Sequence, residues 1–277
     1  MDLDLDTGRL WIFLGGLFFF FIVESFLPAR RSLDGRIKRL AFHAAIAALN
    51  TALVRVVVYA PFLFWAAYVA DQGWGLGRWL GLHGWPEIII SVIVLDLFDY
   101  FWHRANHRIP FLWRFHKAHH TDNEMDVTTA LRFHPGELII SGLVKAGWVL
   151  IWGPSVLAWF AFEAATSLGA QFHHSNISLP EPMERMASRV IVTPRYHLSH
   201  HLVDRSYGDA NYAAIFSFWD RLFGSYSQAP LSPGRQPTPD EIGLPEARSL
   251  SLSFRAWLSE PMLRRNTGLQ APDLGSG

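Results

Sequence analysis

Residues 138–172, LIISGLVKAGWVLIWGPSVLAWFAFEAATSLGAQF, are the stretch of sequence that decides the fold. Only Lys145 and Glu163 are charged in these 35 residues. The stretch is long enough for two apolar helices. A proline in the middle of a helix breaks or kinks it, so Gly153-Pro154 predicts a helical hairpin or two shortened spans.

Three further apolar stretches precede this one, at residues 10–27, 46–70 and 85–102. Half of the 277 residues are hydrophobic and only 17% are charged, against about 25% charged in a typical soluble domain. A very apolar soluble helical protein is the alternative, but a chain of this length is too short to bury four such stretches. We therefore expect an all-α integral membrane protein with about four to five transmembrane or re-entrant helices.

Basic residues gather in the segments that follow residues 10–27, 85–102 and 138–172, whereas the loop at residues 71–84 contains only Arg78. Because basic loops face the cytoplasm, we expect these three segments on the cytoplasmic side and the N-terminus outside. This pattern predicts a multi-pass protein of a bacterial inner membrane. Lys+Arg and Asp+Glu number 24 each, so the chain has no net charge to attract nucleic acid.

The chain has no cysteine and thirteen histidines, so imidazoles are the only borderline-soft metal ligands present in number. Residues three or four positions apart share one face of a helix, so a cluster with this spacing directs its rings to one place. We expect a cytoplasmic, histidine-rich helical cap around a dinuclear metal site. The clusters are His103 and His107; His116, His119 and His120; His173 and His174; and His197, His200 and His201.

Asp96 and Asp99 precede the first histidine pair at helical spacing, so they share its face. Carboxylates inside a membrane span are costly and usually functional, and metal-bound histidines commonly donate their second N–H to a carboxylate. We expect both aspartates to hold metal ligands in this way, with helix packing as the alternative. His134 is expected either beside the metal or substrate, or as a cap of the helix that Pro135 would open.

Other metal chemistry fits the pattern less well. A zinc hydrolase usually carries H-E-x-x-H and a soluble di-iron carboxylate protein carries Glu-x-x-His, and neither motif occurs in this chain. A metal transporter places its ligands near the bilayer midplane, whereas these clusters follow the predicted span ends. Both functions stay open as alternatives. His43 and His83 lie outside the clusters and are expected to be incidental.

The sequence resembles the fatty acid hydroxylase superfamily, also called the sterol desaturase family, over roughly residues 86–226. The matching elements are three histidine boxes in order, with further motifs between and after them. They are His103-Arg-Ala-Asn-His107, His116-Lys-Ala-His-His120, Arg132-Phe-His-Pro-Gly-Glu137, Gln171-Phe-His-His-Ser-Asn176, Thr193-Pro-Arg-Tyr-His-Leu-Ser-His-His201, Asn211-Tyr and Phe218-Trp-Asp-Arg-Leu-Phe-Gly-Ser-Tyr226.

The resemblance implies that the box histidines bind two Fe2+ ions, for which zinc can substitute in preparations. His174 matches the additional ligand of the family better than His173, because it directly precedes Ser175-Asn176. Ala170 stands where some members have another histidine, and Ala213 follows Asn211-Tyr where members commonly have glycine. The implied ligands are His103, His107, His116, His119, His120, His174, His197, His200 and His201.

The resemblance also implies a membrane-bound, O2-dependent non-haem di-iron enzyme that hydroxylates or desaturates a lipid. Its partners are the lipid substrate, O2, the bilayer and an external electron donor, since no haem- or flavin-binding segment is visible in the chain. We expect N-terminal transmembrane helices at residues 1–85, the catalytic domain at 86–226 and an irregular tail at 227–277. The sterol, fatty acyl, carotenoid and ether lipids are all open as substrates, and reduced pterin, used by the alkylglycerol branch, is one possible donor.

Overall fold

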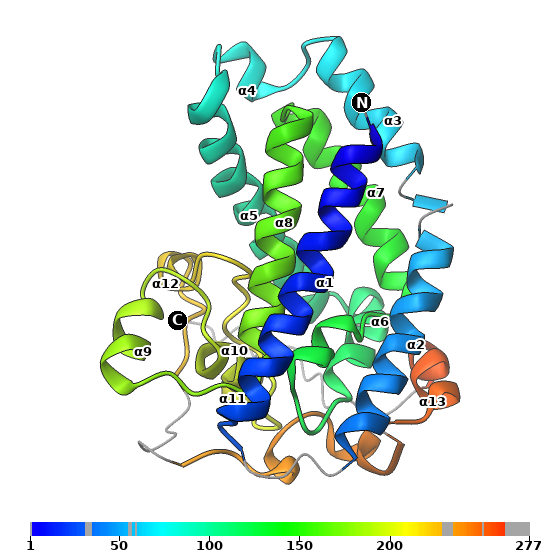
Figure 1. Cartoon of the computed structure of the whole chain (residues 1–277), viewed down its shortest axis with the longest axis vertical. Coiled ribbons are helices and arrows are strands. Elements are labelled where there is room, and N and C mark those ends of the chain that lie inside the picture. The colour runs from blue at the N-terminus through cyan, green and yellow to red at the C-terminus, as the bar shows by residue number, and fades with distance from the viewer. Residues whose placement is uncertain are drawn as a thin grey trace, which may run out of the picture.

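The computed structural model describes residues 2–30, 35–54, 57–58, 60–228, 235–250 and 252–263. Helices form almost all of its regular structure (Figure 1). The first eight α-helices of the described residues precede the third histidine box. They are α1 (Asp2–Phe26), α2 (Arg36–Val54), α3 (Ala60–Asp71), α4 (Leu76–Trp79), α5 (Gly84–Arg108), α6 (Pro110–His120), α7 (Pro135–Trp152) and α8 (Val156–His174).

The predicted all-α membrane architecture is confirmed. Among the described residues, three helices are long and apolar enough to cross a membrane: α1 over Thr7–Phe26, α2, and α7. A fourth crossing results if α3 and α4 are joined to α5, although this pair is bent by 83°. With that pair counted as one span, the described helices give four crossings, the lower end of the expected number; without it they give three.

The predicted hairpin forms between α7 and α8. The left-handed residue Gly153 (φ 69°) ends α7, and the Ser155 side chain caps the start of α8. A Cβ atom on Gly153 would lie 2.0 Å from the carbonyl oxygen of Trp74. Glycine is therefore required here both by the backbone conformation and by the close approach of the 74–75 segment.

The span expected at residues 46–70 is wrong in its boundaries. Helix α2 begins ten residues earlier, and the separate helix α3 follows it. The N-terminal half of α2 contains polar side chains that lower its hydropathy, but Arg39, His43 and Asn50 are buried on one face. These side chains bind the segment after α6 instead of facing lipid, which hydropathy by itself does not reveal.

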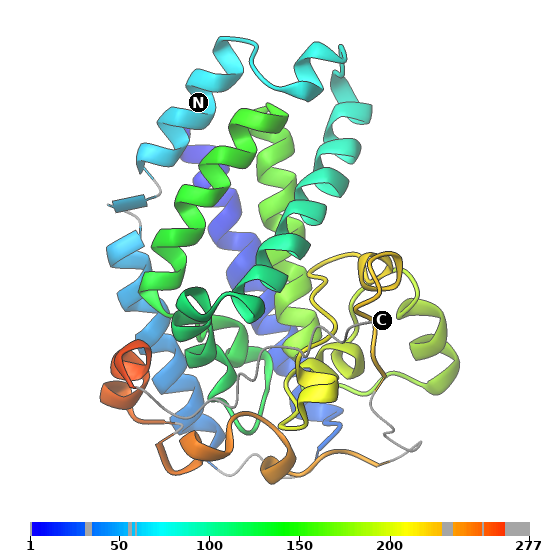
Figure 2. The ribbon, with the colours of Figure 1, turned by 180° about the vertical axis from the view of Figure 1, so that it is seen from behind.

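Helix α8 lies at the centre of the bundle and packs against both α1 and α5 (Figures 1 and 2). Aromatic and aliphatic side chains of α3, α5, α7 and α8 form the main apolar core, which includes Phe62, Leu95, Trp148 and Phe162. At the opposite end from α4, α6 and the short helices of the cap close the bundle. These are η2 (Val127–Leu131), α9 (Glu181–Ala187), α10 (Pro194–His200), α11 (Arg205–Gly208) and α12 (Phe218–Leu222).

The described part of the tail beyond residue 227 is not detached. It contains η3 (Pro239–Glu241), η4 (Pro245–Leu250), α13 (Phe254–Ser259) and η5 (Glu260–Met262). The Trp257 side chain is buried, and the Lys117 ammonium of α6 lies 3.2 Å from the Glu260 carboxylate and 3.1 Å from the Leu263 carbonyl. The segment at residues 252–263 thus packs against α6, the helix that carries the second histidine box.

Candidate metal centre

Nine histidines converge in the cap and divide into two adjoining groups. Within each group the potential ligand nitrogens lie within 4.8 Å of one another. The five-histidine group consists of His103, His107, His116, His120 and His200, and the four-histidine group of His119, His174, His197 and His201. All nine residues implied as ligands by the sequence are in these groups.

Each H-x-x-H-H box contributes to both groups. In α6, His116 and His120 belong to the five-histidine group and His119 to the other. The box at α10 shows the opposite division. His197 and His201 belong to the four-histidine group, and His200 belongs to the five-histidine group. The rings of His120 and His201 stack at 4.4 Å between centroids, so the two groups share a boundary.

Backbone carbonyls orient the rings of the five-histidine group. The His103 Nδ1–H donates to the Tyr212 carbonyl at 2.8 Å, and the His200 Nδ1–H donates to the Ala210 carbonyl at 2.7 Å. Each of these bonds fixes the tautomer with a proton on Nδ1 and leaves the Nε2 lone pair available to a metal ion. The segment at residues 210–212 therefore aims one histidine from α5 and one from α10.

The nitrogens of the four-histidine group lie unusually close together. The Nε2 atoms of His119 and His197 are 3.1 and 3.0 Å from Nε2 of His174, and Nε2 of His201 is 3.2 Å from that of His197. Burial lowers the pKa of His119, His197 and His201 well below the usual range. Neutral imidazoles whose lone pairs converge are the protonation state that metal binding requires.

Unsatisfied buried nitrogens in the five-histidine group support the same assignment. The Nε2 atoms of His107, His116, His120 and His200 are buried and have no hydrogen-bond partner among the described residues. A buried polar group left in this condition costs about 1–3 kcal/mol. A bound cation would remove that cost at all four positions, so the donor set fits a metal ion. Imidazoles suit iron as well as zinc.

Two carboxylates that the sequence did not assign to the site contact its histidines. Glu137 Oε1 accepts a hydrogen bond from His116 Nδ1–H at 2.8 Å, and Asp209 lies 3.5 Å from His107 Nδ1. Glu137 belongs to the Arg132–Glu137 motif that the chain shares with the family. Its position in a motif shared with the family was the available signal for a role at the site.

Asp96 does not contact a histidine, contrary to the expectation. Its carboxylate accepts hydrogen bonds from the Ile215 and Phe216 amides at 3.0 Å and from the Trp219 indole at 2.9 Å. Asp96 thus fixes the segment that follows the Asn211-Tyr motif, a role that depends on a chain segment more than 110 residues away. Asp99 faces a cavity instead, 3.9 Å from the Lys145 ammonium.

The remaining histidines have distinct positions. His134 caps α7, with its Nδ1 accepting a hydrogen bond from the Gly136 amide, so it fulfils the capping alternative. His173 is not in either group, although its ring centroid lies 4.0 Å from that of His197. His43 is buried and hydrogen-bonds Thr128 Oγ1 at 2.6 Å, whereas His83 is exposed at the far end of α5.

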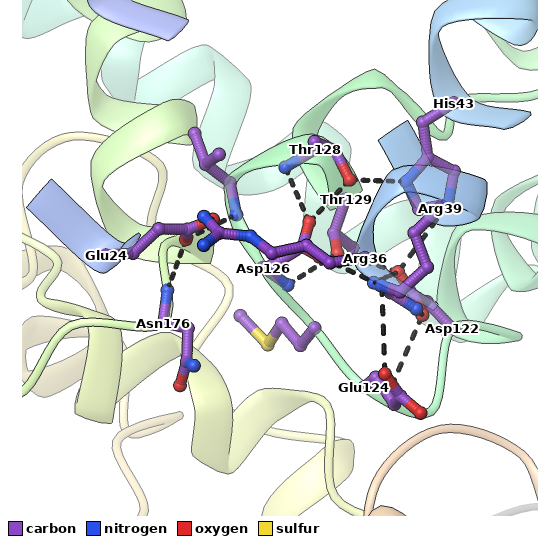
Figure 3. Close-up of polar contacts among 12 residues, drawn as sticks. Glu24, Arg36, Arg39, His43, Asp122, Glu124, Asp126, Thr128, Thr129 and Asn176 are labelled. Carbon is purple, nitrogen blue, oxygen red and sulfur yellow. Dashed lines mark hydrogen bonds and ion pairs between the residues drawn. The ribbon is translucent and has the colours of Figure 1, made fainter. Parts of the chain in front are cut away.

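A buried polar network supports the segment between α6 and η2 (Figure 3). The Arg39 guanidinium donates to both oxygens of Asp122, at 2.7 and 2.9 Å, and to Asp126 at 2.9 Å. Glu24 of α1 accepts from the amides of Val127 and Asn176 at 3.0 and 2.9 Å. Because Asp122 follows the second histidine box by two residues, the network fixes the end of α6.

A cavity of about 300 Å³ reaches both histidine groups from within the helix bundle. His103 and His116 of one group line it, as do His119, His174 and His197 of the other. Further side chains of α1, α5, α7 and α8 line it, together with Ala130, Phe133, Ala213 and Ala214. A volume of 300 Å³ is at the lower end for ligand pockets.

Replacing Glu137 by Gln is expected to weaken metal binding at the five-histidine group. The amide retains the size of the side chain but removes the charge that favours the Nδ1–H tautomer of His116, and loss of such a partner typically costs about 10–100-fold in affinity. Competition with a chelator measures the change. The matched control is Glu87→Gln, in the first turn of α5 at the opposite end of the helix from its histidines. Equal metal affinity in Glu137→Gln and the wild type would contradict the proposed role.

The comparisons with known proteins agree on one family. The family model described as fatty acid hydroxylase matches residues 88–225. Ornithine lipid hydroxylase OlsE of Rhizobium tropici is 26% identical over 66% of this chain and 54% of its own length. Human alkylglycerol monooxygenase is 31% identical over 47% of this chain and 28% of its length, and human cholesterol 25-hydroxylase is 24% identical over 52% of each.

The matched part covers only about half or less of these relatives' own lengths. No solved structure matches the chain significantly. The similarity extends over the segment that carries every histidine of the two groups.

Proposed function

Because the chain belongs to the fatty acid hydroxylase family, we propose that it is a membrane-bound oxygenase that uses O2 to hydroxylate a C–H bond of a lipid. Its similarity to hydroxylases and a monooxygenase supports hydroxylation more than desaturation. The reaction consumes O2, two electrons and two protons, and it converts one C–H bond to C–OH with release of one water molecule.

The observation that carries this proposal is the division of nine histidines, eight of them buried and His103 half-buried, into two adjoining groups beside a cavity. Two iron ions held by these groups would supply the activation of O2. A single-metal hydrolase has no need for a second complete set of ligands. A transporter would need its ligands along a path through the bilayer, whereas these lie together in the cap at one end of the bundle.

The residues of the chain have three tasks in this reaction. The Tyr212 and Ala210 carbonyls and the Glu137 carboxylate hold the imidazole protons on Nδ1, so that the Nε2 atoms of these rings would be available to hold iron. The bundle excludes bulk water from the reacting carbon. The cavity admits the end of a lipid from the membrane and positions the C–H bond near His103 and His174, which line it.

The electron donor and the orientation in the membrane belong to the same proposal. The cap carries the metal ligands and is the part of the bundle where an external donor would deliver electrons. We place it in the cytoplasm, with α1, α2, α7 and the bent α3–α5 pair in a bacterial inner membrane. The basic loops predict this orientation.

The test is elemental analysis of the detergent-purified protein beside an O2-consumption assay with a chemical reductant. We expect about two irons per chain, and O2 uptake that increases when a bacterial lipid extract is added. Mass spectrometry of the extract should then reveal a product heavier by one oxygen atom, labelled when 18O2 is supplied. Iron that binds without O2 uptake, or protein that retains only zinc after iron reconstitution, would refute the oxygenase proposal.

A further inference from the structure

Two opposite charges face the cavity without a close contact between them. Lys145 of α7 and Asp99 of α5 both line it, and their nearest charged atoms are 3.9 Å apart, beyond hydrogen-bond distance. Their side chains retain 23% and 13% exposure. The Lys145 ammonium also lies 5.8 Å from the ring centroid of Trp148 and 5.5 Å from that of Phe162. Charges within apolar helices are costly and usually mark a functional site.

Further polar atoms of the same cavity wall lack partners. Asn106 Oδ1 and Thr166 Oγ1 are buried without a hydrogen bond among the described residues, and their side chains line the cavity. An occupant made only of hydrocarbon would leave both atoms without a hydrogen-bond partner, which is unfavourable for a buried polar group. The wall is therefore suited to an occupant that contains donors and acceptors.

The Lys145–Asp99 pair lies close to the histidine groups. Asp99 precedes His103 by four residues on α5, which corresponds to about 6 Å along a helix. A second ion pair, Arg9–Glu163 at 3.0 Å, lies farther out, because Glu163 precedes His174 by eleven residues or about 16 Å. The loosely paired charges are thus the ones next to the histidines, and the tightly paired charges are remote from them.

We propose that the substrate is a lipid with a zwitterionic headgroup whose carboxylate binds Lys145 and whose amine binds Asp99. This inference rests on the proposed function and specifies its substrate class. The headgroup, rather than the end of a hydrocarbon chain, enters the cavity, and its carbon atoms lie beside the two histidine groups. The small volume of the cavity, about 300 Å³, suits a headgroup with the first part of a chain, and the remainder of the lipid stays in the bilayer.

Three lipids with the same acyl chain test the proposal. Nα-palmitoyl-lysine carries both a carboxylate and an amine, Nα-palmitoyl-norleucine lacks the amine, and Nα-palmitoyl-lysinamide lacks the carboxylate. Native mass spectrometry of the full chain in detergent measures the dissociation constant of each. A charge-assisted hydrogen bond contributes about 1.5–3 kcal/mol, so we expect the zwitterion to bind roughly 10- to 100-fold more tightly than either analogue.

Two variants test which charge of the headgroup each side chain binds. Lys145→Met should abolish the preference for the lysine lipid over the lysinamide lipid and retain the preference over norleucine. Asp99→Asn should have the reverse effect. Lys38→Met, on the exposed face of α2, is the matched control and should change nothing. Melting temperature and metal content confirm that each variant is folded.

The outcomes separate this inference from the proposed function, because binding is measured without turnover. Equal affinities for the three lipids, or a preference unchanged in both variants, would overturn the headgroup assignment even if the protein consumes O2. A preference that the two variants abolish as expected would support it even in protein that shows no O2 uptake.

Discussion

His119→Ala and His200→Ala are expected to remove metal from different groups and to abolish turnover in both cases. His119 belongs to the four-histidine group and His200 to the five-histidine group. The loss of His119 leaves three imidazoles for one ion, whereas the loss of His200 leaves four for the other. We therefore expect His119→Ala to retain about one iron per chain, and His200→Ala to retain between one and two with a weakened second site.

Iron content and chelator competition distinguish these variants. At the affected group we expect the affinity for iron to fall by more than the roughly 10–100-fold that the loss of an outer hydrogen-bond partner typically causes. His83→Ala is the control, because His83 is exposed at the end of the bundle away from the cap. Normal iron content and O2 uptake in His119→Ala or His200→Ala would contradict the ligand assignment, and a large loss in His83→Ala would contradict the location of the site.

Arg39→Met is expected to destabilise the protein by about 3–5 kcal/mol, the cost of removing one partner from a buried ion pair. The Arg39 side chain is 2% exposed, and it neutralises the buried carboxylates of Asp122 and Asp126. Its loss leaves both without their cation. Thermal unfolding in detergent measures the effect, with Lys38→Met as the exposed neighbour on the same helix. A melting temperature equal to that of the wild type would show that the network does not stabilise the fold.

Acid should reduce the difference between Arg39→Met and the wild type. Burial raises the pKa of Asp126, but the Arg39 guanidinium outweighs it and holds this pKa below the ordinary value of 3.8. The stabilisation from the ionised Asp126 is therefore present above about pH 4 and is lost as the pH falls through the folded-state pKa. In Arg39→Met the carboxylate is buried without its cation, so protonation stabilises that variant. A difference that stays constant from pH 6 to pH 3 would contradict this account.

The sequence by itself determined the features that depend on local chemistry. Gly153-Pro154 predicted the hairpin because proline cannot continue a helix and glycine accepts a left-handed backbone. The H-x-x-H-H spacing predicted rings on one side of a helix, and the structure brings those rings together. The family followed from these motifs and is confirmed by the match to residues 88–225.

Only the tertiary structure decided which partner each polar side chain has. Arg39, Lys117 and Arg132 contributed to the basic bias that oriented the chain, yet all three are buried in the described structure. Asp96 shares a helix face with His103, but its carboxylate accepts hydrogen bonds from the segment at residues 215–219 and not from a histidine.

The same distinction applies inside the metal centre. Helical periodicity separates the middle histidine of each H-x-x-H-H box from the outer two, but it does not say which group each one joins. That assignment depends on how α6 and α10 are rotated against each other. Packing across the chain sets this rotation, and Glu137 of α7 reaches His116 for the same reason. Spacing along one helix fixes directions within that helix, whereas contacts between segments distant in sequence fix where those directions meet.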